Sequence, residues 1–116
     1  FDDCCQGKLK KREIKLNNKR SICIVLCSKG YPEQYEKNVK IDGLNNLVLK
    51  KNQYIFHAGT KSENNNILAC GGRVLNFVSL TDNFGSSRND AIKLINQLNW
   101  KNGFYRKDIG YKVIDL

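Results

Sequence analysis

Two spacings of hydrophobic residues divide the sequence into a strand-rich part and one helix. Residues 21–27 form an apolar, β-branched run that is typical of a buried strand. Residues 53–58 and 72–80 are further strand candidates, a short strand is expected at 39–41, and the polar stretch 63–66 predicts the tip of a hairpin-like excursion. The predicted core residues of the two longer candidates are Ile55, Phe56, Val74, Phe77 and Val78.

A single amphipathic helix is predicted over residues 84–98. After Leu80 the spacing of apolar residues changes from two to near four, which places them on one helix face. The residues on this face are Phe84, Ala91, Ile95 and Leu98. Asn83 supplies a side-chain oxygen for the first turn, and from Trp100 onward residues 104–116 return the chain to the sheet. These elements predict an α+β fold with a mainly antiparallel sheet and one long amphipathic helix.

Residues 1–20 differ from the rest of the chain. Their pattern is that of the end of an upstream helix, closed by Gly7, followed by a basic linker. Because this linker has too few apolar residues for a core face, we expect it to be solvated and the compact domain to occupy residues 21–116. The chain begins with Phe1 and contains no methionine, which favours a fragment or a processed product.

The net charge of +9 at pH 7 is high for 116 residues and implies an anionic partner. Its sign does not distinguish nucleic acid, a membrane surface, an acidic protein face or a phosphorylated substrate. Much of the excess lies in the linker, at Lys8, Lys10, Lys11, Arg12, Lys15, Lys19 and Arg20. No stretch approaches the roughly 20 apolar residues of a membrane span, so we expect no membrane partner.

Five cysteines, an odd number, argue against a disulfide framework. The spacing of Cys23 and Cys27 puts both on one face of a strand, where we expect them to pack as small apolar core residues. The cysteines lack the paired spacing of a zinc site, so we expect no metal ligands among them. Free cysteines are typical of a reducing cytoplasm, which is the location we expect.

Four motifs occur in a fixed order along the chain. They are Gly-Tyr-Pro at 30–32, Phe-His-Ala-Gly-Thr-Lys at 56–61, Gly-Gly-Arg-Val-Leu at 71–75 and Arg-Lys-Asp-Ile-Gly at 106–110. In order and spacing they resemble the C-terminal domain of phosphoribosylamine-glycine ligases, also called glycinamide ribonucleotide synthetases. The resemblance implies a fold like that of the C-terminal domain of biotin carboxylase and its ATP-grasp relatives, the rudiment single hybrid motif. Asn38 stands where the family commonly has glycine, and Asn tolerates left-handed backbone geometry.

The resemblance also implies an activity for the full-length enzyme. ATP, glycine and 5-phosphoribosylamine are converted to glycinamide ribonucleotide, ADP and phosphate in de novo purine biosynthesis. In that family an upstream ATP-grasp module binds ATP and Mg²⁺ or Mn²⁺. This chain contains no Walker-type glycine loop and no carboxylate cluster for magnesium. We therefore expect it to be inactive alone, to hold no catalytic residue, and to have phosphoribosylamine and its own upstream domains as partners in a monomeric enzyme.

Two basic residues flank the 62–72 excursion, and each has glycine close by, at Gly59 and at Gly71 and Gly72. If the excursion is a hairpin, Lys61 and Arg73 converge. A guanidinium fork and a point charge suit a phosphate monoester, and backbone amides at Gly59, Thr60 or Gly72 could add donors. Carboxyaminoimidazole ribonucleotide synthetase, a related enzyme, places a Lys and an Arg from this region on its ribose phosphate. By resemblance, we expect Lys61 and Arg73 to hold the 5-phosphate of phosphoribosylamine. The alternative is a solvated lysine and a structural arginine paired with another domain.

Two further residues are expected beside the substrate cleft. Tyr31 shapes a turn there, and His57 is interpreted as a hydrogen-bonded structural histidine. A general-base role for His57 is disfavoured, because the leaving group is phosphate and the attacking amine needs little activation. Asp108 is expected to pair with an arginine or to cap a turn, and Gly110 allows the chain to bend.

The alternative from a different class is a small basic nucleic-acid-binding module. The net charge and the scattered Tyr and Phe residues favour it. It is weakened by the concentration of basic residues in the linker and by the lack of a recognisable aromatic and basic motif such as that of the RNA-recognition sheet.

Overall fold

A computed structural model of the chain describes residues 1–10 and 14–114. The elements in chain order are α1 (Asp2–Cys5), β1 (Arg20–Ser28), β2 (Val39–Lys40), the 3-10 turn η1 (Leu44–Asn46), β3 (Gln53–His57), β4 (Thr60–Glu63), β5 (Asn66–Ala69), β6 (Arg73–Thr81), α2 (Phe84–Leu98), β7 (Gly103–Phe104) and η2 (Tyr111–Val113). The predicted α+β class is confirmed, and α2 has the bounds predicted for the helix.

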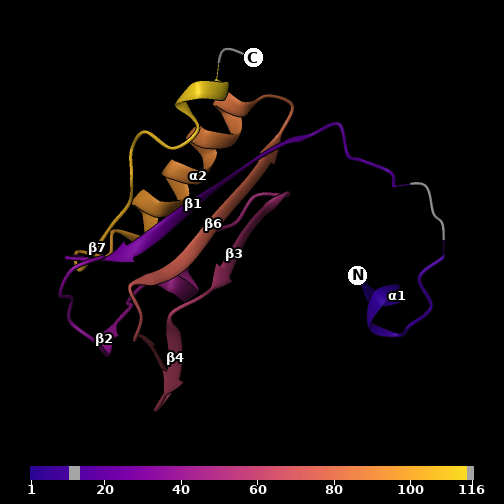
Figure 1. The fold of residues 1–116 in the computed structure, drawn as a ribbon. Coiled ribbons are helices and arrows are strands. Elements are labelled where there is room, and N and C mark those ends of the chain that lie inside the picture. Colours follow the sequence, from indigo (N-terminus) through magenta and orange to yellow (C-terminus); the bar gives the residue numbers. More distant parts are fainter. Residues whose placement is uncertain (11–13, 115–116) are drawn as a thin grey trace.

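Two antiparallel sheets form the body of the molecule (Figure 1). The larger sheet has the strand order β3-β6-β1-β7, and the smaller one has the order β2-β5-β4. Strands β1 and β6 are the long central pair, with Ile24 opposite Phe77 and a register shift between Leu26 and Cys27. The short strand β7 places Phe104 opposite Cys27, so the chain does return to the sheet after Trp100.

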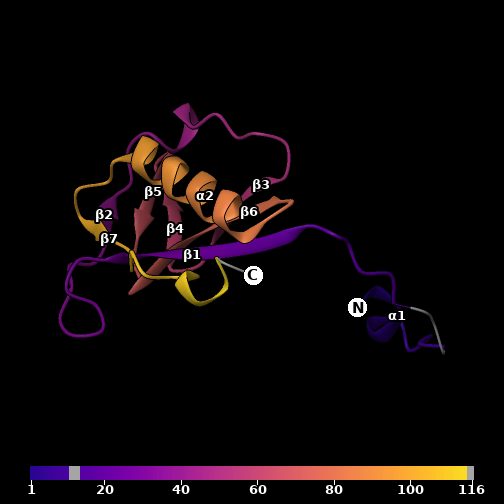
Figure 2. The ribbon, with the colours of Figure 1, turned by 90° about the horizontal axis from the view of Figure 1, so that it is seen from above.

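Helix α2 covers one face of the larger sheet, as the view from above shows (Figure 2). The Asn83 side-chain oxygen accepts a hydrogen bond from the Ser86 amide at 2.8 Å, which confirms the predicted cap. Asn99 closes the helix in the left-handed conformation, with φ 47°. The buried apolar residues between helix and sheet are Ile22, Ile24, Leu26, Leu75, Phe77, Ala91, Leu94, Ile95 and Leu98.

Four of the predicted core residues lie on the other face of this sheet or outside the core. Cys23 is exposed and Cys27 half-buried, because residues 22, 24 and 26 of β1 point toward α2 instead. The two cysteines do share a face, but it is the face without the helix. Phe56 is 55% exposed and Val78 is half-buried on that same face. The prediction was wrong because β1 is apolar on both faces, so its composition does not show which face is covered.

The predicted excursion between β3 and β6 is a hairpin, formed by β4 and β5. Asn64 and Asn65 at its tip both have positive φ, 48° and 62°, which is the backbone geometry of a type I′ turn. At its base the Gly71 amide donates to the Gly59 carbonyl at 3.1 Å. A Cβ on Gly59 would lie 2.6 Å from the Gly71 Cα, so the two backbone segments can approach this closely only because both residues are glycine.

Helix α1 lies apart from the body in both views (Figures 1 and 2). Gly7 follows the helix with φ 65°, and the Lys8 amide donates to the Asp3 carbonyl at 2.9 Å, which closes the helix end.

Lys11 and Arg12 of the basic stretch lie outside the described residues, as do residues 115–116. Among the described residues, neither helix has the length and apolar character needed to span a membrane. Asn38 has φ 62°, the left-handed geometry expected for it.

Candidate functional site

The hairpin base brings Gly59 next to Arg73, whereas Lys61 lies opposite Leu68 within the hairpin. The Gly59 amide donates to the Arg73 carbonyl at 2.8 Å, and Lys61 is two residues further along β4. The Lys61 ammonium lies 3.3 Å from a Glu63 carboxylate oxygen, with 40% of the lysine side chain exposed. Arg73 is exposed and lies opposite Cys27 in the sheet, so these two residues share a face. The two basic side chains therefore have different neighbours.

Thr60 and His57 form a pair at the same junction. The His57 Nδ1 atom lies 2.8 Å from the Thr60 hydroxyl, and the Thr60 amide donates to the Ala58 carbonyl at 2.9 Å. The hydroxyl and the amide of Thr60 are thus both engaged in hydrogen bonds at this tight turn. His57 is exposed at the end of β3, and its hydrogen bond agrees with the structural role expected for it.

Tyr31 packs directly on Gly72. A Cβ on Gly72 would lie 2.0 Å from a ring carbon of Tyr31, so this position accepts no larger residue without movement of the ring. The Gly72 carbonyl accepts from the Ser28 amide at 2.8 Å, and the Gly71 carbonyl accepts from the Ser28 hydroxyl at 2.9 Å. The paired glycines therefore fasten the hairpin base to the end of β1. Sequence reasoning assigned Gly72 to ligand binding and missed this contact, which joins residues 41 positions apart in the chain.

A hollow of about 330 Å³ lies on the face of the sheet opposite α2. The residues that line it are Cys23, Val25, Cys27, Tyr31, Pro32, Phe104, Arg106 and Ile109. Burial raises the pKa of the Cys23 thiol, and burial also raises the pKa of Cys27 although the nearby Arg73 charge acts in the opposite direction. Both side chains are therefore thiols near neutral pH and behave as small apolar groups.

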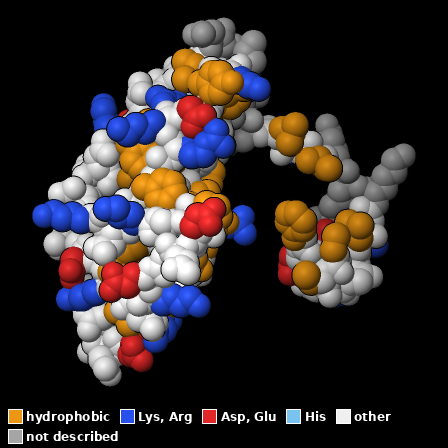
Figure 3. All heavy atoms as spheres, turned by 60° about the vertical axis from the view of Figure 1, so that its left-hand side comes forward, with side chains coloured by type: hydrophobic (Ala, Val, Ile, Leu, Met, Phe, Trp, Pro, Cys, Tyr) orange, Lys and Arg blue, Asp and Glu red, His pale blue; other side chains and the backbone are white. Residues whose placement is uncertain are grey.

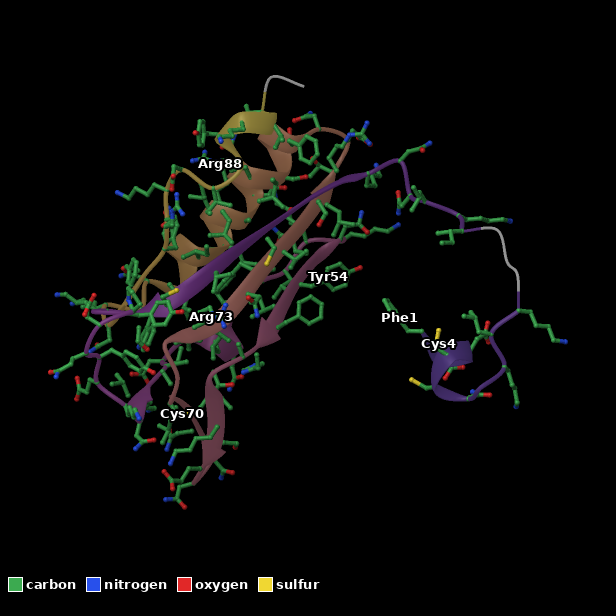
Figure 4. All side chains as sticks on the ribbon, in the orientation of Figure 1. Phe1, Cys4, Tyr54, Cys70, Arg73 and Arg88 are labelled. Atoms are coloured by element: carbon green, nitrogen blue, oxygen red, sulfur yellow. The ribbon has the colours of Figure 1, made fainter. Side chains whose placement is uncertain are left out.

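The Arg106–Gly110 motif closes the domain. The Arg106 guanidinium donates to both Asp108 carboxylate oxygens, at 3.0 and 2.6 Å, which confirms the expected pairing of Asp108 with an arginine. This hydrogen bonding lowers the pKa of Asp108 and raises that of Arg106. Arg88 on α2 donates from Nε to the Ile109 carbonyl at 2.9 Å and also to the Lys107 carbonyl, so it ties the helix to the C-terminal segment (Figure 4). No local feature of the sequence marks Arg88 for this role.

Within residues 1–10 and 14–114 no group of three or more His, Cys, Asp or Glu side chains is placed to hold a metal ion. The described residues thus do not fit an ATP-bound magnesium or manganese ion.

The fold and the four motifs define the C-terminal domain of an ATP-grasp type of ligase. The family described as "Phosphoribosylglycinamide synthetase, C domain" matches residues 21–112, and the chain belongs to this family.

Relatives agree with this assignment. The chain is 36% identical over 104 residues to the phosphoribosylamine–glycine ligase of Caldanaerobacter subterraneus, covering 90% of this chain and 24% of that protein. It is 40% identical over 103 residues to the same-named protein of Fusobacterium nucleatum, covering 88% and 24%. The bifunctional purine biosynthetic protein purD of Dictyostelium discoideum is 36% identical over 113 residues, covering 97% and 14%.

A solved structure is also similar. The phosphoribosylamine–glycine ligase of Thermotoga maritima superposes with a TM-score of 0.64 at 28% identity, covering 78% of this chain and 22% of that one. The chain thus spans about a quarter or less of the length of these relatives. None of these comparisons supports the nucleic-acid-binding alternative.

Proposed function

We propose that this chain is the C-terminal domain of a phosphoribosylamine–glycine ligase that converts ATP, glycine and 5-phosphoribosylamine to glycinamide ribonucleotide, ADP and phosphate in de novo purine biosynthesis. The family match over residues 21–112 carries the proposal. The ATP-grasp part of the enzyme binds ATP with Mg²⁺ or Mn²⁺ and performs the chemistry. We further propose that residues 1–20 connect the two parts and that the enzyme is a monomer. We also propose that it is cytoplasmic, in line with the five free cysteines.

The test of this function is an assay of the complete polypeptide that contains this chain. Glycinamide ribonucleotide forms only when ATP, glycine and phosphoribosylamine are all present, and the 116-residue chain alone forms none. Absence of product from the folded complete polypeptide would refute the proposal.

Within the ligase, Arg73 and Lys61 bind the 5-phosphate of phosphoribosylamine. Two observations support this role. Arg73 is exposed at the base of the hairpin, and the partner of Lys61 is a surface carboxylate, a type of ion pair that contributes at most about 1 kcal/mol and yields readily to a stronger anion. Thr60 and Gly72 shape the turn beside the phosphate, Thr60 through His57 and Gly72 through Tyr31. Tyr31 and His57 act by holding this junction in place.

The phosphate role predicts a selective kinetic effect. A charge-assisted contact contributes roughly 1.5 to 3 kcal/mol, or about ten- to a hundredfold in affinity. Arg73→Ala in the full-length ligase therefore weakens the use of phosphoribosylamine by that order, while the KM values for ATP and glycine stay the same. Lys93→Ala on the exposed side of α2 is the matched control. Unchanged kinetics for all three substrates in Arg73→Ala would favour the structural alternative, a salt bridge to another domain.

A further inference from the structure

The face of the larger sheet that points away from α2 is also apolar. Its exposed or half-buried side chains come from three strands and are Cys23, Val25 and Cys27 of β1, Val78 and Leu80 of β6, and Tyr54 and Phe56 of β3. We call this set the open face. Tyr54 and Phe56 are 46% and 55% exposed and stack with ring centroids 6.1 Å apart. Two aromatic rings are therefore held in a fixed arrangement toward solvent.

Strand register aligns the residues of the open face in rows across three strands. Tyr54 lies opposite Val78, and Val78 lies opposite Cys23 on the next strand. In the next row the polar residue Asn76 of β6 lies between Phe56 and Val25, so the apolar side chains flank it on both sides. Neighbouring strands lie about 4.8 Å apart, so side chains in these rows touch or nearly touch.

The hollow of about 330 Å³ extends the open face toward β7, through Tyr31, Pro32 and Phe104. Two arginines border it, because Arg106 lines the hollow and Arg73 lies opposite Cys27. Figure 3, which brings the β7 side forward, shows hydrophobic side chains in the middle of the body with both basic and acidic side chains around them. An apolar centre with a charged rim is the usual composition of a protein interface.

We infer that the open face is the surface on which the preceding domains of the same ligase polypeptide pack. The inference rests on the proposed function. The matched family is a C domain, and this chain spans 24% of the ligases of Caldanaerobacter and Fusobacterium, so the larger part of such an enzyme is available to cover the face. The complementary surface is apolar and inserts at least one large side chain into the hollow.

Docking through this face accounts for two observations, the exposed apolar patch and the position of Arg73 beside it. Contiguous exposed apolar patches of this kind are uncommon on monomeric proteins and mark interaction sites. The arginine proposed to bind substrate phosphate also borders this face, so docking would place Arg73 at a domain boundary, where ligand sites often occur.

The test is site-specific photocross-linking in the full-length ligase. Phe56→benzoylphenylalanine keeps an aromatic side chain at a position that is outside the core, so the fold is preserved. Lys93→benzoylphenylalanine, on the exposed side of α2, is the matched control. After irradiation and proteolysis, mass spectrometry identifies the peptides that are joined.

The expected result is an intramolecular cross-link from position 56 to a peptide that precedes this domain. The variant with the photoreactive residue at position 93 should form no cross-link to that peptide. Cross-links only between two copies, only to other proteins, or none from position 56 would overturn the inference. The glycinamide ribonucleotide assay on the same preparations tests the proposed function separately, since an enzyme can form product whichever face of its C domain is docked.

Discussion

The two faces of the larger sheet have similar side chains and different environments. Toward α2, Ile22, Ile24 and Phe77 are at most 7% exposed and form the core. Away from it, Cys23, Phe56 and Val78 are equally apolar in type but are exposed or half-buried. Strands that are apolar on both faces are typical of sheets covered on both sides. The comparison teaches that one face stabilises this domain, whereas the other is suited to assembly with a larger protein.

The largest expected difference between the faces is in the effect of removing a phenylalanine ring. Phe77→Ala creates a cavity under α2 and lowers the free energy of unfolding by about 3 to 5 kcal/mol. Phe56→Ala removes an exposed ring and its stacking on Tyr54, and lowers it by about 1 kcal/mol or less. Urea unfolding of the 116-residue chain followed by circular dichroism measures both. Equal losses from the two substitutions would mean that the open face is covered in the chain itself.

An intermediate effect is expected at the hairpin base, where the open face meets the hollow. Gly72→Ala forces a methyl group into the Tyr31 ring and costs about 1 to 3 kcal/mol of stability. Gly85→Ala is the matched control, because a Cβ there meets its nearest atom at 3.5 Å, an ordinary contact, and favours the helix.

A double-mutant cycle separates this clash from other effects. Adding Tyr31→Ala removes the ring, so the Gly72→Ala substitution should cost much less in that background. If the cost is the same with and without the ring, the glycine is required for another reason.

The smallest effect is expected at the rim of the open face, in the titration of Asp108. The hydrogen bond from Arg106 lowers the pKa of this carboxyl, so the pair is fully formed above its ordinary pKa of about 3.9 and is lost as pH falls through the lowered value. Carbon-13 NMR of the Asp108 carboxyl measures the midpoint. Arg106→Ala should return it toward the ordinary value, and an unchanged midpoint would show that the pair does not persist in solution.

The parts of the fold that were predictable from sequence are those governed by neighbouring residues. The bounds of α2 follow from the spacing of its apolar residues and from the cap at Asn83, and the hairpin tip follows from Asn64 and Asn65. Which face of β1 is buried does not follow, since Cys23 and Ile24 are both compatible with a core. The answer depends on where α2 packs, which is a tertiary contact.

The features of the candidate site likewise divide into those visible in short runs of sequence and those that depend on tertiary contacts. The motifs that contain Lys61 and Arg73 were visible because each is a short run of residues. The packing of Tyr31 on Gly72 and the hydrogen bonds from Arg88 to the C-terminal segment were not, because they join residues far apart in the chain. The binding of substrate phosphate by Lys61 and Arg73 stays a prediction.

The most direct test of the central claim, that this domain is one part of a larger ligase, is to sequence the gene upstream of the codon for Phe1. The account predicts an open reading frame that continues upstream in frame and encodes an ATP-grasp module. A start codon immediately before Phe1, with no such module in frame, would contradict it and would leave the open face without its proposed partner.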